Sequence, residues 1–214
     1  FNNRIYGLTK GQYSPTSELG KVTKSTPDGS LDYPFNPVSL AFGAGGTFIA
    51  RAIDVEVKHL SEILTKGEEH KGTSFIEIYQ NCNIFNDGAF SDLTNKETKL
   101  DSRIILKDGE PMVFGESMDK GLILDGFNLK VVDLNKGHSI YDLLVHNTKD
   151  KNLAILLCEM TYAADLPTPL GVFYEEKKPT YEEMMMTQIE SQMNKNKNIN
   201  LKDLIYTANT WKVE

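Results

Sequence analysis

The order of segments near the start of this 214-residue chain constrains its fold more than any other feature. Residues 1–35 are rich in Gly, Ser, Thr, Pro and Asp, which is typical of a long functional loop. Asn36 and Pro37 suit the N-cap and first turn of a helix, and we expect that helix to run through VSLAFGAGGTFIARAI to about Ala52. An amphipathic helix follows in VEVKHLSEILTKGEEH, and TSFIEIYQ has the length and composition of a strand. This order predicts an α/β fold with a parallel sheet.

The second half of the chain has a different pattern. The segments RIILKDGEPMVFG and KGLILDGFNLKVVDL each place Asp-Gly between apolar runs, which predicts two hairpins. NLAILLCEM is expected to be a short apolar strand. Thr180 and Glu183 form a capping-box pattern that predicts a helix over TYEEMMMTQIESQM, and NKNKNINLKDLIYTA is expected to be a polar linker with a short final helix.

Charge and composition exclude several classes of partner. The net charge of -7 argues against nucleic acid, because there is no basic excess to neutralise phosphates. No apolar run approaches the roughly 18 residues that span a bilayer, so no membrane partner is expected. The two cysteines, Cys82 and Cys158, are too few for a disulfide framework and fit a reducing cytoplasm.

The adjacent residues Asn2 and Asn3 allow two interpretations. Mg²⁺ prefers oxygen ligands, and the side chain of Asn3 with the backbone carbonyl of Ile5 could supply two of them within one tight loop. Two adjacent asparagines are also common in plain turns. Lys10, between glycines, could likewise bind a substrate carboxylate or be simply solvated.

Other motifs give weaker signals. GAGGTF lacks the third glycine of a dinucleotide fingerprint, so we expect small residues inside a packed helix. The four histidines show no paired metal-ligand spacing and are expected at the surface or at helix caps. Taken alone, Cys82 and Cys158 are ordinary buried thiols.

The string NNRIYGLTKGQYSPTS resembles the β subunit of 2-oxoacid:ferredoxin oxidoreductases, in particular the 2-oxoglutarate type. The resemblance continues in DYPFNPVSLAFGAGGTFIARA, KHLSEIL, HKGTSFIEIYQNCNIFN and PTPLGVFY, densely over residues 1–90 and loosely beyond them. In that family the Asn-Asn pair closes a thiamine-diphosphate motif that begins with an upstream Gly-Asp-Gly, which is not in this sequence. The resemblance therefore implies an N-terminally truncated subunit. Residues 1–100 would be the C-terminal half of a three-layer, PP-type thiamine-diphosphate-binding domain, and residues 101–214 an α+β extension.

The resemblance also implies which residues bind the cofactors. Asn3 and the carbonyl of Ile5 match Mg²⁺ ligands, while the family's first ligand, an Asp, lies outside this sequence. Cys82 matches the fourth ligand of a [4Fe-4S] cluster whose other three cysteines lie upstream. Cys82 is followed here by Asn83, where many relatives have proline. Cys158 is expected to belong to the core.

The GLTKGQ loop matches the family's substrate region. Leu8 and Lys10 correspond to positions beside the substrate, and Lys10 is expected to favour a dicarboxylate. Tyr6, Thr9 and Gln12 are expected to contact the cofactor or the substrate.

The function implied is part of an enzyme that oxidatively decarboxylates 2-oxoglutarate to succinyl-CoA. Its implied cofactors are thiamine diphosphate, Mg²⁺ and [4Fe-4S], and its partners an α subunit, ferredoxin, CoA and the 2-oxoacid. The truncated chain is expected to be inactive alone. Two alternatives stay open: a pyruvate or branched-chain 2-oxoacid enzyme, against which Lys10 argues, and a non-catalytic truncated subunit module.

Overall fold

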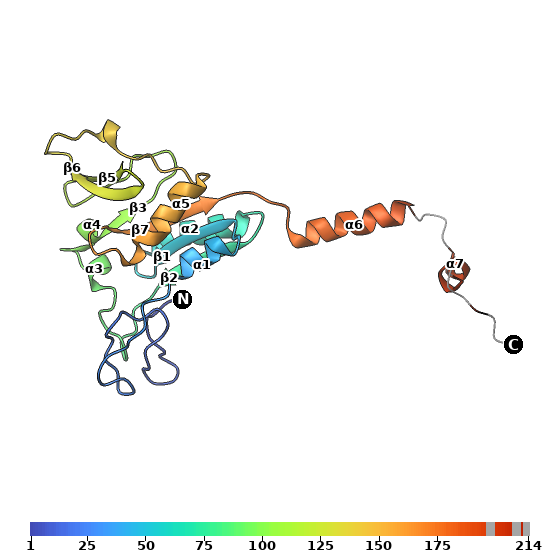
Figure 1. Cartoon of the computed structure of the whole chain (residues 1–214), viewed down its shortest axis with the longest axis horizontal. Helices are drawn as coiled ribbons and strands as arrows, with labels where there is room; N and C mark the ends of the chain where they lie inside the picture. The colour runs from blue at the N-terminus through green and yellow to red at the C-terminus, as the bar shows by residue number, and fades with distance from the viewer. Residues whose placement is uncertain (196–199, 207–210, 212–214) are drawn as a thin grey trace. The chain divides into compact units, whose positions relative to one another are not determined.

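A four-stranded sheet organises residues Phe1–Lys178, one of the two compact units of the chain. The computed structural model describes residues 1–195, 200–206 and 211. The strands lie in the order β2 (Ser74–Tyr79), β1 (Phe48–Ile53), β7 (Thr168–Glu175) and β3 (Arg103–Ile105) (Figure 1). β1 pairs in parallel with β2 and β3 in parallel with β7, while β7 runs antiparallel to β1. The predicted α/β class with parallel pairing is confirmed, and an antiparallel contact joins the two parallel pairs.

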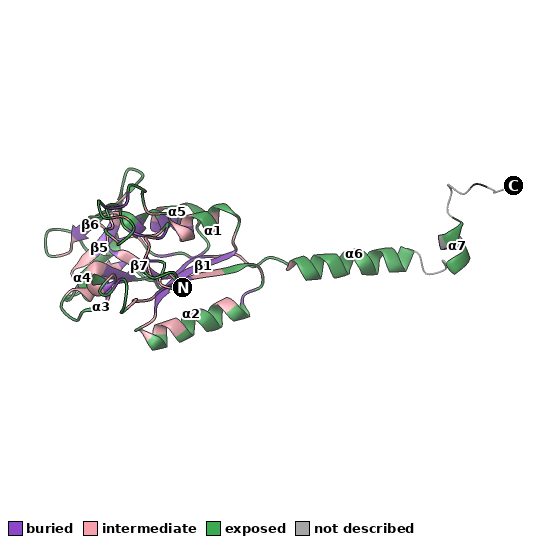
Figure 2. Ribbon diagram, turned by 90° about the horizontal axis from the view of Figure 1, so that it is seen from below, coloured by how far each residue is buried: buried purple, intermediate pink, exposed green. Residues whose placement is uncertain are grey.

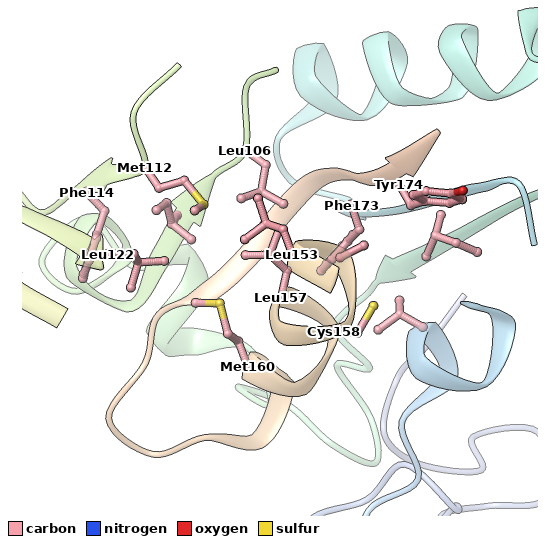
Figure 3. Close-up of a cluster of buried hydrophobic side chains, with 14 residues drawn as sticks. Leu106, Met112, Phe114, Leu122, Leu153, Leu157, Cys158, Met160, Phe173 and Tyr174 are labelled. Carbon is pink, nitrogen blue, oxygen red and sulfur yellow. The ribbon is translucent and has the colours of Figure 1, made fainter. Parts of the chain in front are cut away.

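Helices cover both faces of this sheet. α1 (Pro37–Gly43) and α5 (Lys151–Glu159) lie on one face and α2 (Val57–Glu69) on the other, so the sheet is the middle of three layers (Figure 2). Because side chains alternate along a strand, Ile49 packs with the α1 and α5 side, whereas Phe48 and Ala50 pack with Ile63 of α2. Figure 3 shows Leu153 and Leu157 of α5 next to Phe173 of β7.

Two predicted elements were wrong, both in apolar segments. The helix expected to reach Ala52 ends at Gly43, and GAGGTF is a helix-to-strand turn in which Gly45 has φ +84°. β1 is buried on both faces, so its sequence has no alternation to distinguish it from a buried helix. NLAILLCEM is helical, with all but its last residue in α5, because Asp150 caps that helix by accepting hydrogen bonds from the backbone N–H of Asn152 and Leu153.

Only one of the two Asp-Gly hairpins forms. Asp125 ends β5 (Lys120–Asp125) and Gly126 begins the turn to β6 (Asn128–Asp133), and β4 (Val113–Phe114) completes this antiparallel sheet. The strands flanking Asp108-Gly109 instead pair with different partners, β7 and β5. The Asp108 carboxylate accepts hydrogen bonds from the backbone and the hydroxyl of Thr148, a contact 40 residues away in the chain. The remaining short helices of this unit are α3 (Ser91–Thr94), α4 (Lys99–Ser102), η1 (Ile140–Asp142) and η2 (Met160–Tyr162).

The histidines correct one further expectation. His146 is buried rather than at the surface, and its Nε2 lies 2.7 Å from the Val172 carbonyl oxygen. Burial lowers the pKa of His146 and favours the neutral ring. His70 does occupy the C-cap of α2, as a capping residue, although it too is buried against Thr47.

The second unit, Pro179–Glu214, contains α6 (Tyr181–Lys195) and α7 (Leu201–Ile205). The predicted capping box is confirmed: Glu183 N donates to Thr180 Oγ1 (3.2 Å) and Thr180 N to Glu183 Oε2 (3.1 Å). Part of the predicted linker, residues 196–199, lies outside the described residues, as do residues 207 and 208 at the end of that segment. The predicted domain boundary at residue 100 stays a prediction.

The core between α5 and β7 provides a test of the fold. Leu157 is fully buried, so Leu157→Ala should lower the free energy of unfolding by about 2–5 kcal/mol. Ile155, on the same helix, is 47% exposed, and Ile155→Ala should cost less than about 1 kcal/mol. Urea denaturation of both variants measures the difference, and equal losses would contradict the assigned face of α5.

Candidate functional site

The opening segment of the chain is held at the carboxyl end of β2. Asn2 N donates to the Ile78 carbonyl (2.8 Å), and Gln80 N donates to the Asn2 carbonyl (3.1 Å). Asn2 thus adds a short parallel bridge beside Tyr79 at the edge of the sheet. Ligand sites of open α/β sheets commonly lie beyond the carboxyl ends of their strands, which is where this segment lies.

Two oxygens in this segment accept no hydrogen bond from the described residues. Asn3 Nδ2 donates to the Gln80 carbonyl (2.8 Å), which orients the amide, and none of the described residues donates to Asn3 Oδ1. The Ile5 carbonyl likewise accepts no hydrogen bond from the described part of the chain. Both residues line a cavity of about 820 Å³. The pair fits a Mg²⁺ site that takes its other ligands from phosphate oxygens and water, as Mg²⁺ commonly does.

A buried ion pair joins β1 to β2, the strand that holds this segment. Arg51 of β1 and Glu77 of β2 are register partners, and Arg51 Nε lies 2.8 Å from Glu77 Oε2 with both side chains almost wholly buried. Arg51 Nη2 also donates to Thr161 Oγ1 (2.8 Å). The only sequence signal for this pair was a single charged residue at the centre of each of two apolar strands, and our sequence analysis missed it.

The ion pair reaches the opening segment through Asn2. Glu77 Oε1 accepts a hydrogen bond from Asn2 Nδ2 (2.7 Å). Asn2 Oδ1 in turn accepts from Thr16 Oγ1 (2.7 Å) and from Arg4 N (2.9 Å). The Asn2 side chain therefore uses its amide to hold the segment, whereas the Asn3 amide oxygen accepts no hydrogen bond from the described residues.

The GLTKGQ loop closes on itself next to the cavity. Tyr6 N donates to the Gln12 carbonyl (2.9 Å), and Gly11 N donates to the Tyr6 carbonyl (2.8 Å). Gln12 Nε2 donates to the Thr9 carbonyl (2.8 Å), and the Thr9 hydroxyl donates to Gln12 Oε1. Leu8 is 99% exposed. Of the predicted site residues, the cavity lining includes Asn3, Ile5, Tyr6, Leu8 and Thr9, and excludes Lys10, Gln12 and Cys82.

Cys82 lies close to this loop although it does not line the cavity. A Cβ placed on Gly7 would be 3.6 Å from Cys82 Sγ, and one placed on Gly11 would be 2.7 Å from the Phe85 ring. The two glycines thus let the loop pack on the turn after β2. Cys82 is partly exposed, whereas Cys158 is buried in α5, as expected of a core residue, and its burial raises the pKa of the thiol to about 12.

The thiols do not form a cluster site by themselves. A [4Fe-4S] cluster takes four cysteines, and the described residues contain no group of three or more His, Cys, Asp or Glu that could hold a metal. The part of the chain described here supplies at most one cluster ligand, Cys82.

Comparison with known proteins connects this geometry to a family. Residues 1–78 match the family model for the thiamine pyrophosphate enzyme C-terminal TPP binding domain. The chain is 43% identical to the 2-oxoglutarate oxidoreductase subunit KorB of Mycobacterium tuberculosis, over 218 aligned positions that cover 100% of this chain and 58% of the relative. The chain is thus similar to KorB over its whole length and to a 2-oxoacid:ferredoxin oxidoreductase β subunit over part of it. The resemblance inferred from the NNRIYGLTKGQYSPTS string is thereby confirmed.

Two further relatives extend the comparison. The β subunit of the 2-oxoacid:ferredoxin oxidoreductase of Saccharolobus solfataricus is 49% identical over 86 residues, which cover 40% of this chain and 28% of that subunit. A solved 2-oxoglutarate:ferredoxin oxidoreductase from Magnetococcus marinus, with 2-oxoglutarate, coenzyme A and succinyl-CoA bound, shares the fold with a TM-score of 0.65. It is 22% identical and the match covers 97% of this chain and 56% of that one. The chain thus spans just over half the length of KorB and of this structure.

Among the described residues, no helix is both long and apolar enough to cross a bilayer.

The buried ion pair between Arg51 and Glu77 provides a stability test. Arg51→Met leaves Glu77 buried without its cation and should lower the free energy of unfolding by about 3–5 kcal/mol. Lys130→Ala removes an exposed pair, Lys130–Asp125 at 3.0 Å, and should cost less than about 1 kcal/mol. Denaturant unfolding compares them, and a loss below about 1 kcal/mol in Arg51→Met would contradict the assigned burial.

Proposed function

We propose that this chain is part of a thiamine-diphosphate enzyme that oxidatively decarboxylates 2-oxoglutarate to succinyl-CoA and passes the electrons to ferredoxin. The observation that carries the proposal is the cavity at the end of β2, where Asn3 Oδ1 and the Ile5 carbonyl are both free to bind a cation. Their location within the segment that matches a thiamine-pyrophosphate-binding domain supports this assignment.

Asn3 and Ile5 would hold Mg²⁺, and the metal would hold the diphosphate group of the cofactor. When bound, thiamine diphosphate supplies the nucleophilic carbon and the electron sink that decarboxylation of a 2-oxoacid needs. The protein would orient the cofactor and the 2-oxoacid and exclude water from them. Phe35, Phe75 and Tyr6 add apolar surface to the cavity lining, which strengthens the electrostatic contacts made inside it.

Leu8 and Lys10 are proposed to select the substrate. Lys10 is an exposed cation in the loop beside the cavity, and its ammonium suits the distal carboxylate of 2-oxoglutarate. Pyruvate and branched-chain 2-oxoacids lack that carboxylate. They remain the second candidate, because relatives such as the S. solfataricus subunit are named for 2-oxoacids in general. Thr9 and Gln12 are proposed to hold the loop in shape through their mutual hydrogen bonds.

Cys82 is proposed as one ligand of a [4Fe-4S] cluster whose other three cysteines are not in this sequence. Its partial exposure and its position beside Gly7 support that role. An α subunit and ferredoxin are the proposed protein partners, and the 2-oxoacid and CoA the small-molecule ones. A cytoplasmic location fits the two free thiols. Residues 1–100 are proposed to be half of the cofactor-binding domain.

Cofactor binding is the first test. Asn3→Ala should raise the Kd for Mg²⁺ at saturating thiamine diphosphate by roughly tenfold in the assembled enzyme, because water must replace the amide oxygen in a site with strict octahedral geometry. Asn135→Ala, at an exposed asparagine, is the control and should leave the Kd unchanged. Calorimetry measures both. An unaltered Kd in Asn3→Ala would remove Asn3 from the metal site, and an absence of binding in the unsubstituted protein would favour the non-catalytic module.

Substrate choice is the second test. Lys10→Ala should lower kcat/KM for 2-oxoglutarate by roughly 10- to 150-fold, or ~1.5–3 kcal/mol, and spare pyruvate, because only the dicarboxylate uses the lost charge. Lys24→Ala, at another exposed lysine, is the control. Steady-state rates with 2-oxoglutarate, pyruvate and 2-oxobutyrate distinguish the cases. Equal losses on all three substrates would show that Lys10 serves the cofactor or the fold and would favour the broader 2-oxoacid assignment.

A further inference from the structure

Arg4 stands between the two proposed metal ligands and has an uncommon backbone conformation. Its φ is +51°, in the left-handed region that residues with a Cβ rarely adopt. The torsions of residue 4 set how the Asn3 amide oxygen and the Ile5 carbonyl lie relative to each other, because the two groups flank it in the chain. A change in this conformation would therefore alter the geometry offered to a cation.

Three hydrogen bonds hold the peptide groups on either side of Arg4. Arg4 N donates to Asn2 Oδ1 (2.9 Å). Because Asn2 also donates to Glu77, this bond connects Arg4 to the buried ion pair. The Arg4 carbonyl accepts from Ser17 Oγ (2.6 Å) and from Asn86 Nδ2 (3.2 Å). Ser17 lies in the loop that follows the proposed site, and Asn86 lies in the turn after β2.

The guanidinium group of Arg4 is surrounded by three aromatic rings. Its central carbon lies 4.9 Å from the Phe90 ring centre, 5.2 Å from that of Tyr79 and 5.8 Å from that of Tyr162. The rings belong to three separate segments: β2, the residue before α3, and η2. Arg4 Nε is buried and has no hydrogen-bond partner, and the guanidinium carbon lies within cation–π distance of all three rings. We call Tyr79, Phe90 and Tyr162 the ring clamp.

We propose that Arg4 is a positioning residue for the Mg²⁺ site. The ring clamp fixes the side chain of Arg4, and the side chain together with the three hydrogen bonds holds residue 4 left-handed, so that Asn3 Oδ1 and the Ile5 carbonyl are presented to the same cation. This role rests on the proposed function, because it presupposes that Asn3 and Ile5 bind the metal. Arg4 itself touches neither the metal nor the substrate in this role.

A comparison of Arg4→Gly with Arg4→Ala separates backbone conformation from charge. Both variants remove the guanidinium, but glycine enters the left-handed region freely and alanine does not. Because apparent affinity falls with the fraction of molecules in the competent conformation, Arg4→Ala should raise the Kd for Mg²⁺ at saturating thiamine diphosphate by about tenfold. Arg4→Gly should raise it by only about threefold.

The measurement is a calorimetric titration of Mg²⁺ in the assembled enzyme, with the electron paramagnetic resonance spectrum of bound Mn²⁺ as a second readout of ligand geometry. Met118, an exposed residue with φ +53°, is the matched control, since Met118→Ala shortens a side chain at a left-handed position that does not line the cavity. Met118→Ala should leave the metal Kd and the Mn²⁺ spectrum unchanged. Equal weakening by Arg4→Gly and Arg4→Ala, or no weakening by either, would overturn the proposal.

A second pair of variants covers the case in which Arg4→Ala does not fold. Tyr162→Phe and Tyr162→Leu both remove the hydroxyl that donates to the Phe35 carbonyl, but only Tyr162→Leu removes a ring of the clamp. Tyr162→Leu should bind Mg²⁺ more weakly than Tyr162→Phe by about twofold to threefold. Equal affinities would contradict the clamp.

Asn3→Ala in the same titrations distinguishes this inference from the proposed function. If Asn3→Ala weakens binding while the Arg4 variants do not, only the positioning role fails. If Asn3→Ala binds Mg²⁺ normally, the metal site itself is misassigned and the proposed function loses its support.

Discussion

The buried ion pair between Arg51 and Glu77 is the interaction on which both the sheet and the site depend. Two charges removed from water are tolerated only when their remaining hydrogen-bonding positions are filled. Arg51 meets this demand with Glu77 and Thr161, and Glu77 meets it with Arg51 and Asn2. Asn2 therefore completes the pair, and the centre of the sheet is satisfied only when the opening segment is in its place.

This dependence explains how a segment with almost no regular structure can be held in a defined position. Asn86 Nδ2 donates to the carbonyls of Asn3 (3.0 Å) and Arg4 (3.2 Å), so the turn after β2 supports the segment from a second side. The GLTKGQ loop then packs on the same turn through Gly7 and Gly11. Binding residues on loops positioned by a rigid scaffold are common, and here the scaffold is the carboxyl end of an edge strand (Figure 1).

Local sequence patterns predicted the elements that are stabilised by contacts between residues close in the chain. The Asn36 cap with Pro37, the amphipathic helix α2, the Asp125-Gly126 hairpin and the Thr180–Glu183 capping box all formed as expected. The errors lie where burial removes the pattern that sequence reasoning uses. The sequence predicts helix for β1, which is buried on both faces, and strand for α5, because a short run of apolar residues suits either.

By itself, the sequence determined the family resemblance, the acidic charge, and the caps and turns, since these depend on residue type and on neighbours in the chain. Only the tertiary structure decided that Arg51 and Glu77 meet across two strands and that Asn2 completes them. It also decided that Arg4 lies among rings from three separate segments, and that Asn3 and Ile5 line the cavity while Lys10 and Cys82 lie outside its lining. The physical reason is that these contacts join residues far apart in the chain. They exist only once the sheet has brought its strands into register, and no local pattern encodes which distant charge, ring or carbonyl will be the partner.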